Sequence, residues 1–462
     1  MSLLLVVLPI LAGLLLYALP ANDRFVSKTA GCVVAAGTFV LAVMARGGGE
    51  FTHRWLSRPF AANFHFALGG ISLWIVLLLA VCTFCAILAA DVPRLRNFVA
   101  LLLWLEGTMI GVFTARDLLA FALFWDLMLI PVFFCLTGWG RHRDTAWRYI
   151  IYNFSGGLAL LLATAGFGVL YGTTDVIGGP VHALVGGWAP WIFAGFALAF
   201  LVKTPVWPFH TWMPPAYADT PSPMVAVVSA VQSKAGLYGF IVIGLPFLRD
   251  AMRSSAWLFI ALGLISLLYG AFVALTQSDA KRVVAYSSLS HLGLILLAVF
   301  SFNAVALQGA LIYIVAHGLF SAALFLVIGF VEGREGTRSL AHLGGLGRAH
   351  PKLAGAFTIA ALAALGLPGL AGFSGEIIIL TGVYRSGAVW PALIALIPIV
   401  LAAGYMLRLL QGFMNGPSLP EHPARRDLTF VEALAVAPLF AALVYLGTNP
   451  HVLAGTIALV TQ

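Results

Sequence analysis

Six ionisable side chains of this sequence stand inside long apolar runs, where a charge is costly to bury. They are Asp126, Lys203, Lys234, His291, His317 and Glu376. An ionisable residue within a membrane-spanning segment is rare, and it usually marks the path of an ion or a proton. Carboxyl, amino and imidazole groups all bind and release protons. These residue types therefore predict a proton pathway made of acids, lysines and histidines.

Asp126 and Lys203 are the expected first pair of this pathway. Asp126 lies in the run FALFWDLMLIP, with no other charge within several residues. A carboxylate in such surroundings must be paired, hydrated or protonated, and Lys203 is its natural partner. A nearby carboxylate favours the charged lysine, so a change in their separation would load or unload a proton on Lys203. The alternative is a static buried ion pair that only fixes helix packing.

Lys234 is the next expected step. It lies in the run SAVQSKAGLYG, near the middle of the following apolar segment. Its small neighbours Ser233 and Gly236 predict room for water beside the amino group, which would let Lys234 receive a proton from Lys203. The alternative is an amine that extends along its own stem to the membrane interface.

The later half of the chain holds the expected relay and exit. His291 and His317 have serines nearby, and a neutral imidazole both donates and accepts, which suits a relay. A helix–helix hydrogen bond is the alternative for each histidine. Glu376 follows a glycine-rich helix break, so we expect an exit-side site there, or else a cap on the half-helix that begins after the break. The apolar run around Glu106 fits a packing role as well as a coupling role.

Composition and run length indicate the fold class. The 462 residues are 61% hydrophobic and only 9% charged, whereas soluble proteins carry about 25% charged residues. The apolar runs last about 18–25 residues and lack the two-residue alternation of a membrane β-barrel. The chain is therefore predicted to be an all-α, polytopic membrane protein with about fourteen transmembrane helices. The predicted spans are 2–19, 29–46, 66–89, 97–114, 117–137, 147–171, 185–209, 222–247, 256–276, 283–301, 304–330, 352–383, 388–411 and 428–448.

Two predicted helix breaks suggest an internal repeat. Prolines cluster from Pro205 to Pro223, directly after Lys203, and glycines cluster within 362–380, around Glu376. Matched interrupted helices in two halves are typical of inverted-repeat transporters, so we expect two inverted five-helix repeats with broken helices. The expected division is 1–92 for the N-terminal transmembrane helices 1–3, 93–250 for the first five-helix half-channel, 251–412 for the second, and 413–462 for the C-terminal helix.

The loop charges predict the orientation. Loops on one side of the predicted bundle carry sixteen of the 25 lysines and arginines, loops on the other side carry seven, and two lie within spans. The first side, here called the basic face, includes Arg141, Lys281, Arg334 and Arg338. Cytoplasmic loops are enriched in basic residues, so the basic face is predicted to be cytoplasmic and both termini to lie on the outer side.

Several classes of chemistry find no support. The sequence has no Walker motif, no glycine fingerprint for a dinucleotide and no cysteine cluster for an iron–sulfur centre. The C-x-x-C pair Cys82 and Cys85 has no facing Cys or His pair at usable spacing. We therefore expect no cofactor and no metal in this chain. Its energy is expected to come from an ion gradient or from a partner protein.

Seven stretches resemble the antiporter-like membrane subunits of respiratory complex I, most closely those of the M type. The stretches are FWDLMLIP (124–131), FLVKTPVWPFHTWMPPAYADTPSP (200–223), QSKAGLYG (232–239), SDAKRVVAYSSLSHLG (278–293), YIVAHGLFSAALF (313–325), RSLAHLGGL (338–346) and GLPGLAGFSGE (366–376). They are spread over about 250 residues, and the fourteen-helix plan covers the whole chain. An acid at 376 is similar to the M type, because the sister subunits usually carry lysine there.

The resemblance implies a function and a role for each matching residue. Asp126 and Lys203 resemble the carboxylate–lysine pair of the first half-channel, and Lys234 resembles the central lysine. The two histidines resemble the connecting polar axis, and Glu376 the terminal site. The implied partners are the other membrane-arm subunits and a peripheral redox arm that couples NADH–quinone oxidoreduction to proton pumping, in the bacterial inner membrane.

Two departures from the family pattern leave alternatives open. The family usually has Glu where this chain has Asp126, and it commonly has an acid before the third span, where this chain reads FALGGISLW with Gly69. The chain is then a divergent member. A subunit of a multi-subunit Na⁺/H⁺ antiporter, a subunit of a proton-pumping membrane-bound hydrogenase and a scaffold whose buried charges only pack helices are the alternatives.

Overall fold

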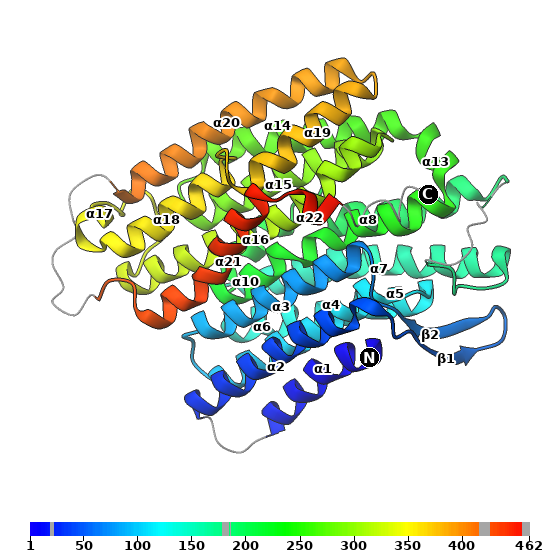
Figure 1. Ribbon diagram of the computed structural model, residues 1–462, viewed down its shortest axis with the longest axis horizontal. Helices are drawn as coiled ribbons and strands as arrows, with labels where there is room; N and C mark the ends of the chain where they lie inside the picture. Colours follow the sequence, from blue (N-terminus) through cyan, green and yellow to red (C-terminus); the bar gives the residue numbers. More distant parts are fainter. Residues whose placement is uncertain (19–22, 178–183, 185, 415–425, 455–462) are drawn as a thin grey trace.

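The computed structural model describes residues 1–18, 23–177, 184, 186–414 and 426–454, and these form one tilted bundle of helices (Figure 1). The longer helices are α1 (Ser2–Ala18), α2 (Arg24–Met44), α3 (Ile71–Ala89), α4 (Leu95–Thr114), α5 (Leu118–Leu127), α6 (Leu129–Trp139), α7 (Arg143–Tyr171), α8 (Ala189–Lys203), α14 (Ala256–Thr276), α15 (Ala280–Phe300), α16 (Ala304–Glu335), α18 (Pro351–Ala364), α19 (Ala371–Arg385), α20 (Val389–Met414) and α21 (Phe430–Thr448). The shorter ones are η1 (Ala45–Gly47), α9 (Met213–Asp219), α10 (Ser222–Ala230), η2 (Gln232–Lys234), α11 (Ala235–Gly239), η3 (Phe240–Gly244), α12 (Leu245–Phe247), α13 (Arg249–Ser254), α17 (Leu346–Ala349) and α22 (His451–Ala454).

The helices confirm a helical membrane fold. Within the described residues, eleven helical segments are long and apolar enough to cross a membrane. The shorter apolar helices are α1, α8 and α18, and the last two are those that the predicted breaks interrupt. The count of fourteen spans and the division into four parts remain predictions.

The centre of the bundle is formed by α16, with α15 and the helices of residues 222–247 beside it. The apolar stretch of α16 is entirely buried by protein, whereas only 28% of those of α2 and α21 is buried. Protein, rather than lipid, therefore surrounds the polar side chains of the central helices. Buried polar groups require such surroundings, because lipid offers them no hydrogen bonds.

Both predicted helix breaks are present. Proline residues end α8 directly after Lys203, and the chain is irregular until α9 begins at Met213. Some freed groups find partners, since the Trp207 amide donates to Ser266 Oγ (2.9 Å). In the later half, α18 ends at Ala364 and α19 begins at Ala371. Gly366 adopts a positive φ of 77° between them, a conformation that glycine adopts without strain.

A third interruption was not predicted. Residues 222–247 were expected to form one continuous span, but α10 ends at Ala230 and a 3-10 turn follows over η2. Further along, η3 is a π-helical segment. Such irregular turns inside a helix leave backbone carbonyls free to bind side chains, and they are frequent at functional sites. Lys234 is the last residue of the 3-10 turn.

The all-α fold class is confirmed, with a small β-hairpin that the sequence analysis did not predict. Strands β1 (Phe51–Leu56) and β2 (Ala62–Phe66) form an antiparallel hairpin, and α3 starts at Ile71 rather than at 66 (Figure 1). His65 Nδ1 lies 2.7 Å from Asp175 Oδ1, which fastens β2 to the loop after α7. A hydropathy search averages over about 20 residues, so strands of this length are hidden in it.

Candidate proton pathway

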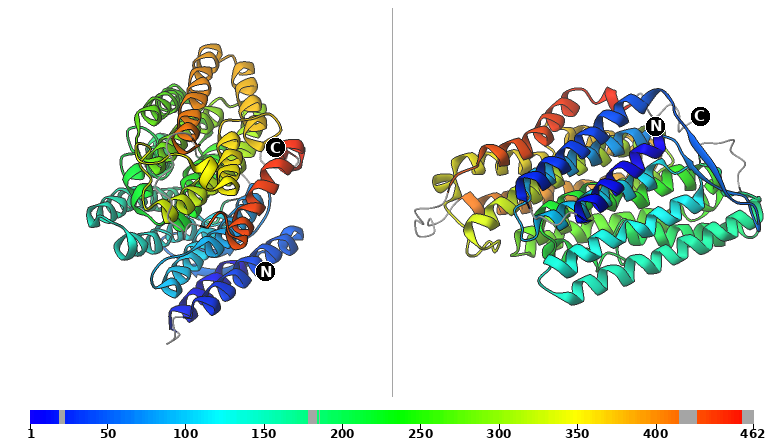
Figure 2. Two further views of the ribbon diagram at one scale, coloured as in Figure 1. Left: turned by 90° about the vertical axis from the view of Figure 1, so that its left-hand side faces the viewer. Right: turned by 90° about the horizontal axis from the view of Figure 1, so that it is seen from below.

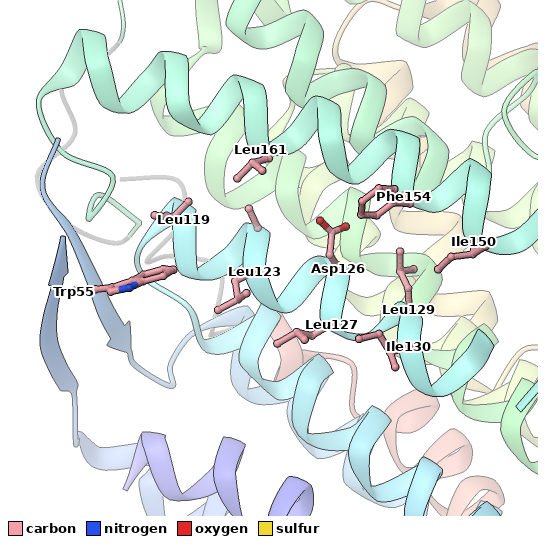
Figure 3. Close-up of a pocket in the computed structure, with 11 residues that line it drawn as sticks. Trp55, Leu119, Leu123, Asp126, Leu127, Leu129, Ile130, Ile150, Phe154 and Leu161 are labelled. Carbon is pink, nitrogen blue, oxygen red and sulfur yellow. The ribbon is translucent and has the colours of Figure 1, made fainter. Parts of the chain in front are cut away.

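Asp126 lies near the end of α5, just before the α5–α6 junction at Met128. Its carboxylate points toward α7 (Figure 3), where Gly157 leaves space for it, because a Cβ at 157 would collide with Asp126 Oδ1. Oδ1 is buried and has no hydrogen-bond partner within the described part of the chain. Asp126 lines a cavity of about 500 Å³ whose walls are otherwise apolar. Its lining includes Trp55, Leu119, Leu123, Phe154 and Leu161.

Lys203 is the last residue of α8 and is only 1% exposed. Its Nζ lies 5.0 Å from the centroid of the Trp125 ring, which stabilises the cation by a cation–π interaction. The charges of Asp126 and Lys203 act on one another. No direct salt bridge joins them in the residues that the structure describes, so the predicted pair is near but open. The arrangement therefore differs from a closed buried ion pair, in which the carboxylate and the amine would be in direct contact.

Lys234 is fully buried, and its Nζ donates to the carbonyl oxygen of Ser229. The expectation that Gly236 leaves room for water was wrong. A Cβ at Gly236 would collide with the Phe200 carbonyl oxygen and with Thr204 Oγ1. The glycine instead lets the end of α8 lie directly against the turn that holds Lys234, so the segments of Lys203 and Lys234 are in contact. The sequence showed a small residue but not the neighbour that fills its space.

His291 in α15 and His317 in α16 face each other. Their ring centroids are 5.4 Å apart with an interplanar angle of 86°. Lys234 acts electrostatically on both rings. Neither nitrogen of His317 has a hydrogen-bond partner in the described ranges. The two histidines therefore lie in the second half beyond Lys234, and they have unpaired nitrogens that can exchange protons.

Two tyrosines lie beside His291, one of them bonded to Glu376, and the sequence did not point to either. The Tyr405 hydroxyl lies 3.4 Å from His291 Nε2, and the Tyr313 hydroxyl donates to Glu376 Oε1 at 2.5 Å. The ring centroids of His291 and Tyr313 are 5.7 Å apart. Tyr313 precedes His317 by four residues in α16, which places both on one helix face. That spacing was a signal that sequence reasoning missed.

The second break shapes the surroundings of Glu376. A Cβ at Gly366 would lie 2.6 Å from Glu376 Oε2, so the break residue must be glycine for space as well as for its φ. Glu376 stands one turn inside α19, and its side chain bonds to Tyr313. The carboxyl group thus extends a series of buried polar groups, called the polar line below, which is formed by Lys203, Lys234, His291, His317, Tyr313 and Glu376. Glu106 lies apart from it, buried in α4, and neither carboxyl oxygen has a hydrogen-bond partner in the described residues.

Gly157→Ala tests the position of Asp126. We expect the added methyl group to push the carboxylate out of its place and to lower proton pumping by the assembled complex by at least about fivefold. Gly166→Ala is the matched control on the same helix, because a Cβ there meets Ile192 at an ordinary 3.7 Å. Pumping by vesicles that hold each variant is the measurement. Equal pumping by the two variants would show that the position of the carboxylate is unimportant.

This chain is similar in sequence to known membrane proteins of one family. Residues 115–402 match the model of the family described as NADH:quinone oxidoreductase/Mrp antiporter, TM. NADH-quinone oxidoreductase subunit M of Pseudomonas aeruginosa is 35% identical, over 90% of this chain and 86% of that protein. Subunit M of Mycobacterium tuberculosis is 32% identical, over 96% and 90%.

Solved structures agree with the sequence matches. A chain of respiratory complex I from Thermus thermophilus superposes with a TM-score of 0.90 and 32% identity, over 100% of this chain and 98% of that one. A chain of the Mrp complex from Dietzia, with a TM-score of 0.85, 21% identity and 99% and 96% coverage, shares the fold. The chain belongs to the NADH:quinone oxidoreductase/Mrp antiporter transmembrane family, among the subunit M proteins of NADH-quinone oxidoreductase.

Proposed function

We propose that this chain translocates protons as a membrane subunit of a complex I-type NADH–quinone oxidoreductase. One observation carries the proposal: a line of buried ionisable groups runs through the centre of the bundle and joins the two helix breaks. Lys203 stands at the first break, Lys234 at the irregular turn, and Glu376 beyond the second break. Ionisable groups so placed mark proton relays.

The proposed mechanism begins at the open pair. Redox events in partner subunits change the distance between Asp126 and Lys203. This change loads or unloads a proton on Lys203 and so alters the charge beside Lys234. One proton then moves from the cytoplasm through Lys203 and Lys234, along the histidines, and to Glu376 and the outer side. Tyr313 and Tyr405 hold hydrogen bonds at the end of this line. The chain itself holds no cofactor in this proposal, so the oxidation and reduction occur in its partners.

The proposal includes partners and orientation. The chain would lie in the bacterial inner membrane beside other membrane-arm subunits and be driven by a peripheral redox arm. α1 begins and α21 ends at the end of the bundle where the hairpin lies (Figures 1 and 2). An even number of crossings gives such an arrangement. Both ends then share one side, and the proposal makes it the outer side because cytoplasmic loops are enriched in basic residues.

Purification and reconstitution test the proposal. Tagged chain, isolated from membranes, should copurify with an NADH-binding flavoprotein and with iron–sulfur and quinone-site subunits, identified by mass spectrometry. In sealed vesicles, NADH and quinone should then drive formation of a pH gradient that an uncoupler removes. Quinone reduction without a pH gradient in tight vesicles would contradict the proposal.

A cation/proton antiporter is the second candidate, because the Mrp complex chain has the same fold and the family model includes such antiporters. The same vesicles distinguish it. Sodium-dependent proton movement without any electron donor would favour the antiporter, whereas pumping that needs NADH and not sodium favours the oxidoreductase. Copurification with a nickel–iron protein would indicate a hydrogenase assembly instead.

A further inference from the structure

A polar cavity lies at the basic face between α7, α9 and the turn that joins α14 to α15. Its volume is about 540 Å³, within the roughly 300–1,000 Å³ that is typical of small-molecule sites. Its lining holds three aspartates and four arginines, which are Arg141, Arg148, Arg282 and Arg338. Unlike the apolar cavity beside Asp126, this one is therefore suited to a charged or polar molecule.

Two of the three aspartates are already bonded within the protein. Asp219 accepts a hydrogen bond from the Thr145 hydroxyl at 2.6 Å, and it lies 3.1 Å from Nδ1 of His142. Asp279 pairs with Arg338 at 2.6 Å, and its other carboxylate oxygen caps the start of α15. These two carboxylates are thus held by other groups of the cavity wall.

Two of the four arginines have no acid to bind. Arg141 and Arg338 each pair with Glu332, at 2.7 Å and 3.5 Å. No salt bridge joins Arg148 or Arg282 to an acid within the described residues, although both line the cavity. A guanidinium group presents a planar fork of donors that matches a phosphate group. Two such forks at one cavity indicate a site for a phosphate-bearing anion.

The smaller cavity beside this one, of about 390 Å³, shows the contrast. Its basic residues all have acid partners: Arg334 pairs with Glu432 at 2.5 Å and Lys281 pairs with Glu332 at 3.1 Å. The two arginines that it shares with the larger cavity are bound to Glu332 as well. The protein itself thus balances the charge of the smaller cavity, whereas the larger one retains two unpaired cations.

The start of α7 also faces the larger cavity. The helix begins at Arg143, and the preceding residue His142 provides no side-chain cap. The free amides of a helix N-terminus attract anions. Asp144 acts against this attraction, because it lies in the first turn of α7, lines the cavity and forms no salt bridge in the described part of the chain.

Outward-facing apolar side chains flank the cavity on both sides. On α7, Trp147 precedes Arg148 and is 57% exposed, and Ile151 is 60% exposed. On α14, Phe272 is 53% exposed and stands shortly before Gln277, which lines the cavity. Tryptophan is enriched where a membrane meets water. The charged cavity therefore lies at the end of two apolar helix surfaces, an arrangement that fits a lipid better than a free anion.

We propose that this cavity binds the headgroup of an anionic phospholipid of the cytoplasmic leaflet. Its phosphate would lie between Arg148 and Arg282, and its acyl chains along the exposed sides of α7 and α14. Basic pockets between transmembrane helices on the cytoplasmic side bind such headgroups. The lipid would join α7 to the turn before α15, and so link the two predicted half-channels. The inference rests on the orientation in the proposed function, and it does not depend on proton transport.

Photolabelling of the whole complex in vesicles tests the inference. The probe is phosphatidylglycerol with a photoreactive acyl chain, and mass spectrometry measures the labelled peptides of α7 and α14. We expect saturable labelling that unlabelled phosphatidylglycerol displaces and phosphatidylcholine does not. In the double variant Arg148→Gln/Arg282→Gln, the concentration for half-maximal labelling should rise at least about tenfold, since each basic residue near an anionic lipid contributes roughly fivefold.

Two further variants control this result. Arg249→Gln/Arg385→Gln makes the same change of charge at two exposed arginines whose loops lie opposite the basic face, and it should label like the unaltered chain. Asp144→Asn removes the carboxylate that repels an anion from the cavity. This variant should reach half-maximal labelling at a lower concentration than the unaltered chain.

The outcomes separate a lipid site from the other occupants. Unchanged labelling in the double variant would overturn the inference, and so would equal displacement by phosphatidylcholine. Displacement by inorganic phosphate as effective as by phosphatidylglycerol would show a free-anion site and overturn the assignment to a lipid. If the double variant fails to assemble, unchanged labelling of Asp144→Asn overturns the inference. Failure of the proposed function would appear elsewhere, as normal pumping after replacement of Lys203.

Discussion

Replacement of Lys203 by Ala is expected to abolish proton pumping and the quinone reduction coupled to it, with the complex still assembled. The ammonium lies over the Trp125 ring, and no direct salt bridge joins it to Asp126 in the described residues. Its removal leaves one buried acid without its counter-charge, so the pair no longer responds to a change in separation. The expected loss is at least about a hundredfold, the scale for a group on which a proton transfer depends.

Lys203→Met is the matched variant, because it keeps the length and volume of the side chain and removes only the charge. A scaffold role predicts that Met supports pumping, since apolar replacements of buried ion pairs are often tolerated. A switch role predicts that Met fails as completely as Ala. The measurements are the pH gradient formed per quinone reduced and the amount of assembled complex. Pumping by Lys203→Met at the unaltered rate would refute the proposed mechanism.

Glu376→Gln should produce the second-largest loss. Glutamine keeps the shape of the side chain and can still accept from Tyr313, but it cannot bind and release a proton. The polar line then ends at Tyr313 with no group to deliver the proton to the outer side. We expect pumping to fall at least about tenfold while helix packing around Gly366 is kept.

Two variants control this result. Glu50→Gln makes the same chemical change at an exposed residue that directly precedes strand β1 in the sequence, and this variant should pump normally. Tyr313→Phe removes the hydrogen bond to Glu376 and keeps the acid, so a smaller loss is expected. If Glu376→Gln pumps at the unaltered rate, the exit lies at another residue and the polar line does not serve transport.

The sequence was enough to predict a helical membrane protein and the ionisable residues at its centre, because each of these signals is visible within a single stretch of the chain. A charge inside a long apolar run is visible without a neighbour, as at Asp126 or His317. Proline and glycine interrupt helices by their own backbone chemistry, so the breaks after Lys203 and before Glu376 were evident. The separations of these residues, and the order in which they meet, were not evident.

What the sequence by itself determined is therefore the membrane fold, the helix breaks and the identity of the central acids, lysines and histidines. Only the tertiary structure decided that the Lys203 amine lies over the Trp125 ring, that α8 fills the space beside Gly236, and that Tyr313 bonds to Glu376. The physical reason is that these relations join helices far apart in the chain. A tyrosine ring counts as apolar in a hydropathy pattern, and its hydroxyl becomes significant only when a partner from another helix lies within hydrogen-bond distance.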